Sequence, residues 1–595
     1  MSDGPWDDPA PNRNALWGRL IVEELARAGV TAACIAPGSR STPLVVALAS
    51  HPAIETFSHL DERSAAFFAL GRGKRTHRPC AIVTTSGTAV ANLHPAIIEA
   101  DRGRVPMLAL TADRPPELHD SGANQTIDQR NLFGGAVRWF RDLPEPAAQG
   151  RRMRAVRTAV SRAVGLATGP PAGPVHVNVP FAKPLEPTQG PGAVPADLAD
   201  RCPKAATGRS GPFVAPDAGV RGPSSDRIDG VCNLIEEANR GLIVCGPTDR
   251  DIAAPLVSLA RATGFPILAD PLSGLRFGPH VSDPTVTVLG GYDSWLDHID
   301  TDGWDAAPIV LRFGANPTSS TLQAHLGGIE THTVIVDPAG DWREASFPGG
   351  ELLRADPGRF ATQIVDTLGA GHADANWRRR LGAIDGEYWS VVADSEEYFE
   401  GGIVADTVHH APDPSTIVIS NSMPIRDADR FARPHSSQTR VLGNRGASGI
   451  DGIPSTALGA ESACDDPTVL ILGDLALYHD MNGLLAVDRF ELTPTIVAIN
   501  NDGGGIFHML PIEEYDPPFT EHFKTPHDLD FTHVADLYGL EHVRVTDREA
   551  FRAAYRAALG NPAPVLLEAM IDAEKSHRTR EQLHDAVGST LEFDP

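Results

Sequence analysis

Two continuous apolar runs, joined by a segment with helical spacing, constrain this chain more than any other feature of its sequence. The runs are 469–472 and 495–499, and turn residues follow each of them directly, Gly473-Asp474 after the first and Asn500-Asn501 after the second. A strand, a helix and a second strand in this order predict parallel neighbouring strands joined by a right-handed crossover. Asp474 and Asn501 then fall at the carboxyl ends of the strands, the edge at which open α/β sheets bind ligands.

The residues at these two strand ends predict a magnesium–diphosphate site. Asp474, the side-chain oxygen of Asn501 and the carbonyl of Gly503 are hard oxygen ligands of the kind that Mg²⁺ prefers. Gly473 and the glycines at 503–505 would let backbone N–H groups approach a phosphate closely. Taken singly, Gly-Asp and Asn-Asn pairs are more often ordinary turns after buried strands. The rest of the chain therefore has to decide between the two interpretations.

Length and composition limit the class of protein. A chain of 595 residues predicts three to four domains, and 42% hydrophobic with 22% charged residues is typical of a globular protein. The acidic segment 1–14 does not have the pattern of a signal peptide, and no apolar run approaches the roughly 18 residues that a membrane span needs. Six scattered cysteines without a C-x-x-C pair favour free thiols in a reducing compartment. We therefore expect a cytoplasmic protein that does not enter a membrane.

The charge of the chain excludes some partners and favours one kind of environment. A formal net charge of −26 argues against nucleic acid or an anionic membrane surface as a partner. Nearly all of the 51 basic residues are arginines, since lysine occurs only at positions 74, 183, 204, 524 and 575. An acidic, lysine-poor composition resembles proteins of salt-accumulating halophiles, in which salt screens the repulsion between carboxylates. The simpler alternative is an acidic protein of an ordinary mesophile.

Apolar runs alternate with helical segments along most of the chain, which predicts an α/β fold of three tandem parallel-sheet domains. The strands expected in the first domain are 31–35, 81–84, 106–111 and 175–179. Those expected in the second are 242–245, 267–269, 309–313 and 333–336, and those in the third are 416–420, 469–472, 495–499 and 565–569. No G-x-G-x-x-G follows a strand of the second domain, so the sequence gives no support for dinucleotide binding there.

Four arginines are expected at strand ends in a chain with few positive charges. They are Arg40, Arg114, Arg426 and Arg445. Each could be an ordinary solvated loop residue, and Ser39 ahead of Arg40 could be only a helix N-cap. A planar guanidinium, however, binds a carboxylate through paired hydrogen bonds. Four of them at the strand ends of an acidic chain favour a substrate that carries several carboxylates.

Other residues have a functional and a structural interpretation side by side. Glu62 begins a predicted helix, where a carboxylate usually serves only to compensate the helix dipole. The stretch 84–100 is a glycine-containing turn into a helix of small residues, for which close packing is favoured over ligand binding. Gln125 lies in a polar loop and Ile450 lies between small residues, so solvation and core packing are their default roles. Ile506-Phe507 could form one wall of an apolar pocket.

Seven stretches together resemble thiamine diphosphate (ThDP)-dependent enzymes, and in particular the 2-succinyl-5-enolpyruvyl-6-hydroxy-3-cyclohexene-1-carboxylate synthase (MenD) family. They are APGSRSTPL, LDERSAAFFALG, TTSGTAVANL, LTADRPPEL, GANQTIDQ, NRGASGIDG and GDLALYHDMNGL, in conserved order between about residues 15 and 515. The Gly-Asp and Asn-Asn pairs mark only the ThDP superfamily, which typically has Gly-Asp-Gly where this chain has Gly473-Asp474-Leu475. GSRSTPL, TADRPPEL and NRGASGIDG are more specific to the synthase.

The resemblance implies a domain plan, a cofactor and a reaction. The implied domains are a pyrimidine-binding domain (1–190), a linker (191–225), a central domain without cofactor (226–380) and a diphosphate-binding domain (381–595). ThDP with Mg²⁺ or Mn²⁺ would lie between the first domain of one subunit and the third of its partner, in a homodimer or homotetramer. The implied reaction of menaquinone biosynthesis decarboxylates 2-oxoglutarate and adds the succinyl carbanion in 1,4 fashion to isochorismate. Both substrates are dicarboxylates, which agrees with the four arginines.

The resemblance also implies roles for single residues. Glu62 would bind N1′ of the aminopyrimidine and favour the imino tautomer that takes the proton from the thiazolium C2. Asp474, Asn501 and the Gly503 carbonyl would hold the metal, and Ile450 would bend the cofactor. The other implied cofactor contacts are Ser422, Gly473, Leu475, Ala476 and Ile506. The implied substrate contacts are Ser39, Arg40, Arg114, Gln125, Arg426, Arg445 and Phe507.

One departure and three alternatives complete the prediction. Relatives often carry a lysine in the loop 314–322, where this chain has Ser319-Ser320, so the basis for a central-domain contact to a substrate carboxylate is missing. Another ThDP-dependent 2-oxo acid decarboxylase or carboligase, such as an acetolactate synthase, would need fewer guanidinium groups. A non-catalytic protein of the same fold would be expected to lack Glu62. A dinucleotide-dependent oxidoreductase is disfavoured by the missing glycine motif.

Overall fold

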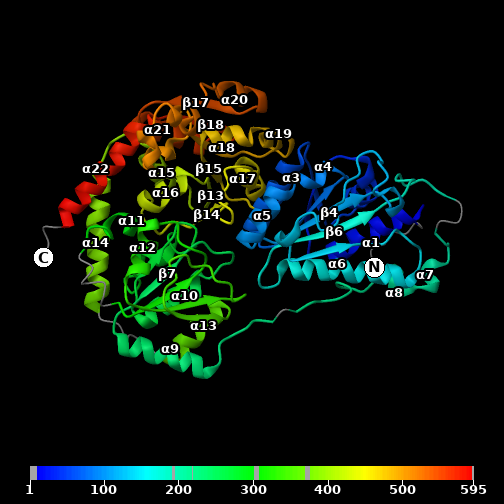
Figure 1. Ribbon diagram of the computed structural model, residues 1–595, viewed down its shortest axis with the longest axis horizontal. Coiled ribbons are helices and arrows are strands. Elements are labelled where there is room, and N and C mark those ends of the chain that lie inside the picture. Colours follow the sequence, from blue (N-terminus) through cyan, green and yellow to red (C-terminus); the bar gives the residue numbers. More distant parts are fainter. Residues whose placement is uncertain (1–9, 191–193, 218, 300–306, 369–374, 592–595) are drawn as a thin grey trace. The chain divides into compact units, whose positions relative to one another are not determined.

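The computed structural model describes residues 10–190, 194–217, 219–299, 307–368 and 375–591. Three six-stranded sheets follow one another along the chain, and all the strand pairings described below are parallel (Figure 1). The α/β fold of three parallel sheets predicted from the sequence is therefore confirmed. By their internal contacts the residues form two compact units. The first unit comprises Met1–Ala218, Arg445–Asp465 and Asp480–Leu492, and the second comprises Gly219–Asn444, Asp466–His479 and Thr493–Pro595.

The first sheet lies in the first unit. In spatial order its strands are β2 (Glu55–Ser58), β1 (Ala32–Ile35), β3 (Cys80–Thr84), β4 (Met107–Asp113), β6 (Pro174–Pro180) and β5 (Trp139–Asp142). The helices of the amino-terminal segment are α1 (Arg13–Arg27), α2 (Thr42–Ala49), α3 (Glu62–Thr76), α4 (Thr88–Ala91), α5 (His94–Gly103), α6 (Gly150–Thr168), α7 (Leu198–Arg201) and α8 (Pro203–Thr207). The later segments of the unit add α17 (Ile453–Glu461) and α19 (Leu485–Arg489).

Apolar side chains fix how these helices cover the first sheet. Trp17 of α1, Leu44 of α2 and Val160 of α6 are buried in one cluster with strand residues such as Val83 and Leu110. Leu198 of α7 and Ala205 of α8 belong to the same cluster, so this part of the segment predicted as a linker packs onto the first sheet.

Glycines allow α3 and α17 to approach each other closely. A Cβ on Gly71 would lie 1.9 Å from the Thr456 carbonyl oxygen, and a Cβ on Gly459 would lie 2.0 Å from that of Phe68. Since either methyl group would collide with backbone, the two helices are in direct backbone contact there.

The second sheet lies in the second unit and contains no residue predicted to bind cofactor. In spatial order its strands are β12 (Gly350–Arg354), β11 (His332–Asp337), β10 (Ile309–Phe313), β7 (Leu242–Cys245), β8 (Ile267–Ala269) and β9 (Val288–Leu289). The helices around it are α9 (Ser225–Ala238), α10 (Ala253–Thr263), α11 (Tyr292–Trp295), α12 (Ser320–Gly328), α13 (Pro357–Leu368) and α14 (Ala375–Ala393). The last helix, α22 (Ala573–Leu591), runs beside α14, and its Val587 is buried in the core of this sheet (Figure 1).

The third sheet, also in the second unit, carries the motif from which the sequence analysis began. In spatial order its strands are β14 (Thr439–Gly443), β13 (Ser415–Ile419), β15 (Thr468–Gly473), β16 (Thr495–Asn500), β18 (Val565–Met570) and β17 (Glu541–Val545). Its helices are α15 (Glu400–His409), α16 (Met423–Phe431), α18 (Asp474–His479), α20 (Thr532–Tyr538) and α21 (Arg548–Leu559). Strands β15 and β16 are parallel neighbours, as predicted, with Gly473 in register with Ile499.

Among the described residues, no helix has the length and apolarity needed to cross a bilayer.

Candidate active site

The strand ends of β15 and β16 bring Asp474 and the loop after Asn501 together. Asp474 is the first residue of α18 and is 2% exposed. Its Oδ1 accepts a hydrogen bond from the Leu475 N–H at 2.7 Å, and its Oδ2 accepts one from the Gly503 N–H at 2.9 Å. Burial raises the pKa of this carboxyl group, while these two N–H donors act in the opposite direction. A buried carboxylate is thus held against the 503–505 turn, as the sequence predicts for one half of a metal site.

Asn501 presents an oxygen that no group of the described protein satisfies. Its Nδ2 donates a hydrogen bond of 2.6 Å to Oε1 of Glu400, the first residue of α15, and this contact orients the amide. Its Oδ1 is buried and has no hydrogen-bond partner. Because a buried polar atom without a partner is costly, this oxygen fits a cation as its partner. Asp474, Asn501 and the Gly503 carbonyl therefore form a donor set that suits Mg²⁺ or Mn²⁺.

A later segment covers the 501–505 turn. The backbone at Gly503 has a φ of +133°, and a Cβ there would lie 2.0 Å from the Lys524 carbonyl oxygen. That carbonyl oxygen accepts a hydrogen bond of 2.7 Å from the Gly504 N–H. His527 places Nε2 3.2 Å from Oδ2 of Asp474. The glycine in this turn is thus required by both its backbone conformation and the close approach of a second segment.

Glu400 belongs to a buried charged cluster beside the predicted metal ligands. Burial, together with the nearby Asp427 carboxylate, raises the pKa of Glu400 to about 7. Burial also raises the pKa of Asp427 to about 6, against the opposing effect of Arg580, which forms an ion pair of 2.5 Å with it. Asp427 lies on α16 and Arg580 on α22, so three helices supply this cluster. This cluster could not be predicted from the sequence, since none of its members belongs to a recognisable motif.

The remaining predicted contacts of the second unit lie at the carboxyl ends of the same sheet or in the loops that follow them. Ser422 has a φ of +70° directly before α16, and its carbonyl oxygen accepts a hydrogen bond of 2.6 Å from Nη1 of Arg426. Ile506 and Phe507 are half-buried, and the Phe507 ring packs edge-on against Phe523 at 5.4 Å. Gly473 and Leu475 are half-buried and Ala476 is buried beside Asp474.

The first unit gathers three of the predicted substrate contacts around the loop after β3. Arg114 donates a hydrogen bond to Oγ of Ser86 in this loop. Gln125, with a φ of +55°, donates from Nε2 to the Ser86 carbonyl oxygen at 2.9 Å. The loop before Arg40 also approaches it, since a Cβ on Gly38 would lie 2.2 Å from Cβ of Thr85. Ser39 is exposed beside this contact.

Two of the arginines are buried close to each other. Arg40 is 7% exposed and Arg114 is 8% exposed. Nη1 of Arg40 donates to the Phe181 carbonyl oxygen at 2.6 Å, whereas its Nε is buried without a partner. Burial and the neighbouring Arg114 charge lower the pKa of Arg40, and burial lowers the pKa of Arg114. Two adjacent buried guanidinium groups with an unpaired N–H are suited to bind an anion.

Glu62 is the first residue of α3 and is half-buried. Its Oε2 accepts a hydrogen bond of 3.2 Å from Nδ2 of Asn92. The preceding Asp61 caps the helix by accepting from the Arg63 N–H, and it also accepts from Asn482 Nδ2 at 2.6 Å. The start of α3 is therefore held firmly while the Glu62 side chain keeps one oxygen for another partner.

Arg445 and Ile450 lie on the loop that precedes α17, in the first unit. Both residues are half-buried. The loop ends at Gly452, which has a φ of +66° and leaves no room for a side chain because a Cβ would lie 2.0 Å from the Phe67 ring. Glu62, Arg40, Arg114, Gln125, Arg445 and Ile450 thus belong to one compact unit, and Ser422, Arg426, Asp474, Asn501 and Phe507 belong to the other.

Two further observations concern alternative sites. Ser319, which stands in the loop where relatives often have a lysine, accepts from the Leu322 N–H as the N-cap of α12 and donates to Asp293 at 2.6 Å.

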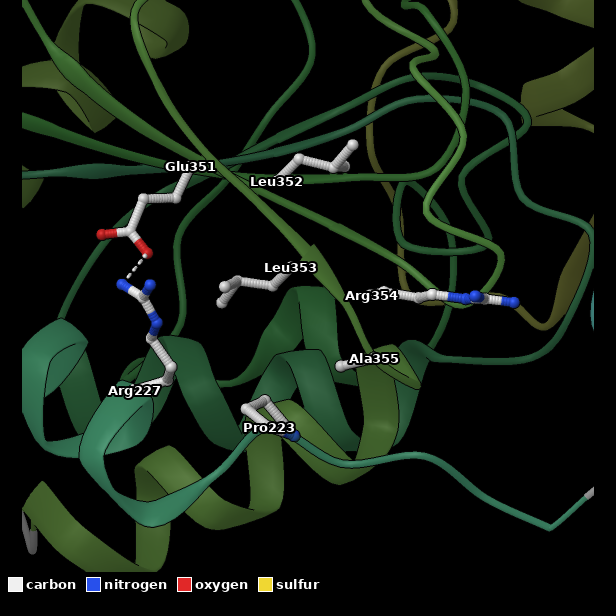
Figure 2. Close-up of a pocket in the computed structure, with 7 residues that line it drawn as sticks. All are labelled: Pro223, Arg227, Glu351, Leu352, Leu353, Arg354 and Ala355. Atoms are coloured by element: carbon white, nitrogen blue, oxygen red, sulfur yellow. Dashed lines mark hydrogen bonds and ion pairs between the residues drawn. The ribbon is translucent and has the colours of Figure 1, made fainter.

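A cavity of about 310 Å³ lies between the start of α9 and strand β12, where Arg227 pairs with Glu351 at 3.3 Å (Figure 2). No candidate site residue predicted from the sequence lines it, and Arg227 and Glu351 of its lining pair with each other. Within the described ranges no group of three or more His, Cys, Asp or Glu could hold a metal.

Two family models and a solved structure match this chain. Residues 17–132 match the family model of the thiamine pyrophosphate enzyme N-terminal TPP binding domain, and residues 426–569 match that of the C-terminal TPP binding domain. The solved structure of a Rhodococcus jostii thiamine diphosphate-dependent 4-hydroxybenzoylformate decarboxylase has the same fold, with a TM-score of 0.70, 18% identity and coverage of 93% of this chain and 99% of that one.

Curated relatives match over nearly the full length. This chain is 53% identical to the 2-succinyl-5-enolpyruvyl-6-hydroxy-3-cyclohexene-1-carboxylate synthase of Haloarcula marismortui, over 98% of this chain and all of that one. It is 54% identical to the synthase of Halobacterium salinarum, over 97% and 99%. It is 45% identical to that of Roseiflexus castenholzii, over 98% and 100%. The chain therefore belongs to the 2-succinyl-5-enolpyruvyl-6-hydroxy-3-cyclohexene-1-carboxylate synthase (MenD) family of thiamine diphosphate-dependent enzymes.

Proposed function

We propose that this protein is a ThDP-dependent transferase that decarboxylates 2-oxoglutarate and adds the succinyl group to isochorismate, forming 2-succinyl-5-enolpyruvyl-6-hydroxy-3-cyclohexene-1-carboxylate for menaquinone biosynthesis. The observation that carries the proposal is the full-length likeness to synthases of that name, which spans both TPP-binding regions. The local geometry supports it at two places: the donor set around Asp474 and the buried guanidinium pair around Arg40.

The cofactor would be held by the strand ends of β15 and β16. Asp474, Asn501 and the Gly503 carbonyl would bind Mg²⁺ or Mn²⁺, which in turn would bind the diphosphate. The partnerless Oδ1 of Asn501 supports this assignment. Ser422, Ile450, Gly473, Leu475, Ala476 and Ile506 would contact the organic part. When bound, ThDP supplies the carbon nucleophile and the electron sink that a 2-oxo acid decarboxylation requires.

The protein's own groups would handle the proton and the carboxylates. Glu62 would hold a proton on its side-chain oxygen at the pyrimidine of the cofactor, and its anchored helix start would keep that oxygen in place. Arg40, Arg114, Arg426 and Arg445, with Ser39 and Gln125, would bind and orient the two dicarboxylates. Phe507 would close the apolar side and help to exclude water.

The assembly we propose is a homodimer or homotetramer with active sites between subunits. In it, Glu62 of one subunit would contact the pyrimidine of the cofactor whose diphosphate is held by the metal site of its partner. The domains would be a pyrimidine-binding domain (1–190), a linker (191–225), a central domain (226–380) and a diphosphate-binding domain (381–595). The six cysteines are free, which supports a reducing, cytoplasmic location.

An assay of the purified protein with 2-oxoglutarate and isochorismate, with and without ThDP and Mg²⁺ in high salt, tests the proposal. We expect 2-succinyl-5-enolpyruvyl-6-hydroxy-3-cyclohexene-1-carboxylate to form only when both substrates, cofactor and metal are present. Pyruvate, in place of 2-oxoglutarate, is the matched control because it lacks the distal carboxylate. Turnover of pyruvate to acetolactate at a higher kcat/KM would instead identify an acetolactate synthase and overturn the proposal.

A further inference from the structure

We propose that Glu99 is a positioning residue of the active site: it anchors the backbone of the 445–450 loop and thereby fixes the direction of Arg445 toward the substrate carboxylate. The proposal rests on the proposed function for the role of Arg445, but the anchoring itself rests on contacts within the first unit. Glu99 stands in the 84–100 stretch, for which sequence reasoning favoured mere packing.

The contacts of the Glu99 carboxylate are directed at the loop. Glu99 lies on α5 and is 3% exposed. Its Oε1 accepts a hydrogen bond of 3.0 Å from the Gly446 N–H, and its Oε2 accepts one of 2.7 Å from the Ala447 N–H. The two donors are consecutive backbone N–H groups, so the two oxygens of one carboxylate bind adjacent residues of the loop. Hydrogen bonds to an ionised acceptor are stronger than those between neutral groups.

A cation completes the anchor. Nζ of Lys74 on α3 lies 3.3 Å from Oε1 of Glu99, and both side chains are almost fully buried. The carboxylate therefore has three donors and no acceptor among these partners. A glutamine in its place would turn an NH₂ group toward one of these donors, because an amide has one accepting atom whereas a carboxylate has two. The site is thus built for an ionised carboxylate rather than for any polar side chain.

The loop is also pressed against α5 sterically. A Cβ on Gly446 would lie 2.6 Å from both the Glu99 carbonyl oxygen and the Gly103 N. Because these are backbone atoms, they cannot move aside as a side chain would. The loop and the helix are consequently in contact through main chain as well as through the carboxylate.

The anchored residues, Gly446 and Ala447, lie between the proposed substrate contact Arg445 and the proposed cofactor contact Ile450. Arg445 immediately precedes Gly446, and Ile450 follows Ala447 by three positions. Fixing the Gly446 and Ala447 amides fixes the direction in which the Arg445 side chain leaves the backbone. Holding a binding group in place before the substrate arrives lowers the entropy cost of productive binding. The other end of the 84–100 stretch holds Ser86, which contacts Arg114, so the whole stretch supports substrate-side arginines.

Three variants test the proposal. Glu99→Gln weakens the anchor while keeping the shape of the side chain. Gly446→Ala disturbs the same contact from the loop side. Glu24→Gln is the matched control, because Glu24 is a fully buried carboxylate of the same unit that pairs with Arg157 at 2.7 Å and accepts from the Phe213 N–H at 2.9 Å. The measurements are backbone hydrogen exchange over 444–452, KM and kcat for isochorismate and for 2-oxoglutarate, and the dissociation constant of ThDP, all on the full-length protein.

We expect faster exchange of the Gly446 and Ala447 amides in both test variants and not in Glu24→Gln. We expect KM for at least one of the two dicarboxylates, isochorismate or 2-oxoglutarate, to rise about tenfold in Glu99→Gln, with kcat and ThDP affinity changed by less than about threefold. An unchanged KM for both would contradict the positioning of Arg445 by Glu99. Unchanged exchange in the loop, or the same kinetic change in Glu24→Gln, would overturn the proposal. If the wild-type enzyme has no activity with 2-oxoglutarate, the proposed function fails, and the exchange result still decides whether Glu99 anchors the loop.

Discussion

At the scale of single residues, the amide nitrogen and the amide oxygen of Asn501 have different surroundings. The nitrogen is bound to Glu400 and the oxygen is left for a cation. An amide can rotate by half a turn and exchange the positions of its oxygen and nitrogen, so a fixed acceptor for the nitrogen determines where the oxygen points. Groups behind metal ligands commonly have this effect on affinity. Glu400 would therefore affect a metal bound at Asn501 without contacting it.

Replacing Glu400 by alanine is expected to lower Mn²⁺ affinity about 10- to 100-fold in the presence of ThDP, because the Asn501 amide loses the group that orients it. Electron paramagnetic resonance of free Mn²⁺ measures this directly. Glu344→Ala is the matched control, since Glu344 is also buried and pairs with Arg312 at 2.8 Å, but beside the second sheet. Equal losses of Mn²⁺ affinity in both variants would contradict the role of Glu400.

Replacing Glu62 by glutamine is expected to lower kcat about 10²- to 10⁴-fold while ThDP still binds, because the substitution keeps the shape and removes the charge that holds a proton. Steady-state kinetics and fluorescence titration with ThDP check the two halves of this prediction. Glu55→Gln, an exposed change in the neighbouring strand, serves as the control. Full turnover in Glu62→Gln would show that another group carries the proton.

Some of these residues could be predicted from the sequence and others could not. Asp474, Asn501, Arg40, Arg114 and Arg426 could be predicted because each comes after an apolar run, and strand ends are where ligands bind. Arg445 follows β14, a strand without such a run, and was identified only through the motif around it. Glu400 and His527 could not be predicted, since they contact the site from 101 residues before Asn501 and 53 residues after Asp474. Nothing in their local sequence differs from an ordinary helix start or loop. The predicted roles of all these residues await the experiments above.

At the scale of elements, the strands that could not be predicted are the two edge strands of each sheet. The twelve predicted strands correspond to the four inner strands of each sheet, whereas β2, β5, β9, β12, β14 and β17 were missed. Inner strands of a parallel sheet are covered on both faces and read as continuous apolar runs. The edges are largely exposed or half-buried, as in β12 and β17, where one residue in five is buried. Without an apolar run, an edge strand resembles a loop.

The turn after β16 allows a prediction at this scale. Gly503→Ala should abolish most of the rise in melting temperature that ThDP with Mg²⁺ produces, because the new methyl group would meet the Lys524 carbonyl oxygen and displace the turn. Gly539→Ala is the matched control, with a φ of +71° and no atom within 4 Å of the added Cβ. It should cost about 1–2 kcal/mol of backbone strain and keep the ligand-induced rise. Equal ligand-induced rises in both variants would count against a cofactor role for this turn.

At the scale of the whole molecule, charge is the dominant feature. A net charge of −26 implies strong repulsion between carboxylates unless salt screens it. We expect the melting temperature to fall as KCl is lowered from about 3 M to about 0.1 M, where the screening length lengthens from below 3 Å to roughly 10 Å. Differential scanning calorimetry across this range, with NaCl as a parallel series, measures the effect. A melting temperature independent of both salts would favour the ordinary acidic protein over the halophilic one.

The first compact unit is assembled from segments that are far apart in the chain. Helix α3 ends at residue 76, yet it packs closely against α17, which begins at residue 453. During synthesis the amino-terminal segment leaves the ribosome first, but its partner helix is still untranslated for several hundred residues. The aromatic and alanine side chains on that face of α3 therefore remain exposed to solvent until the carboxyl-terminal third of the chain has emerged. Nascent chains of this protein are consequently expected to need chaperone protection from the emergence of α3 until α17 has been translated.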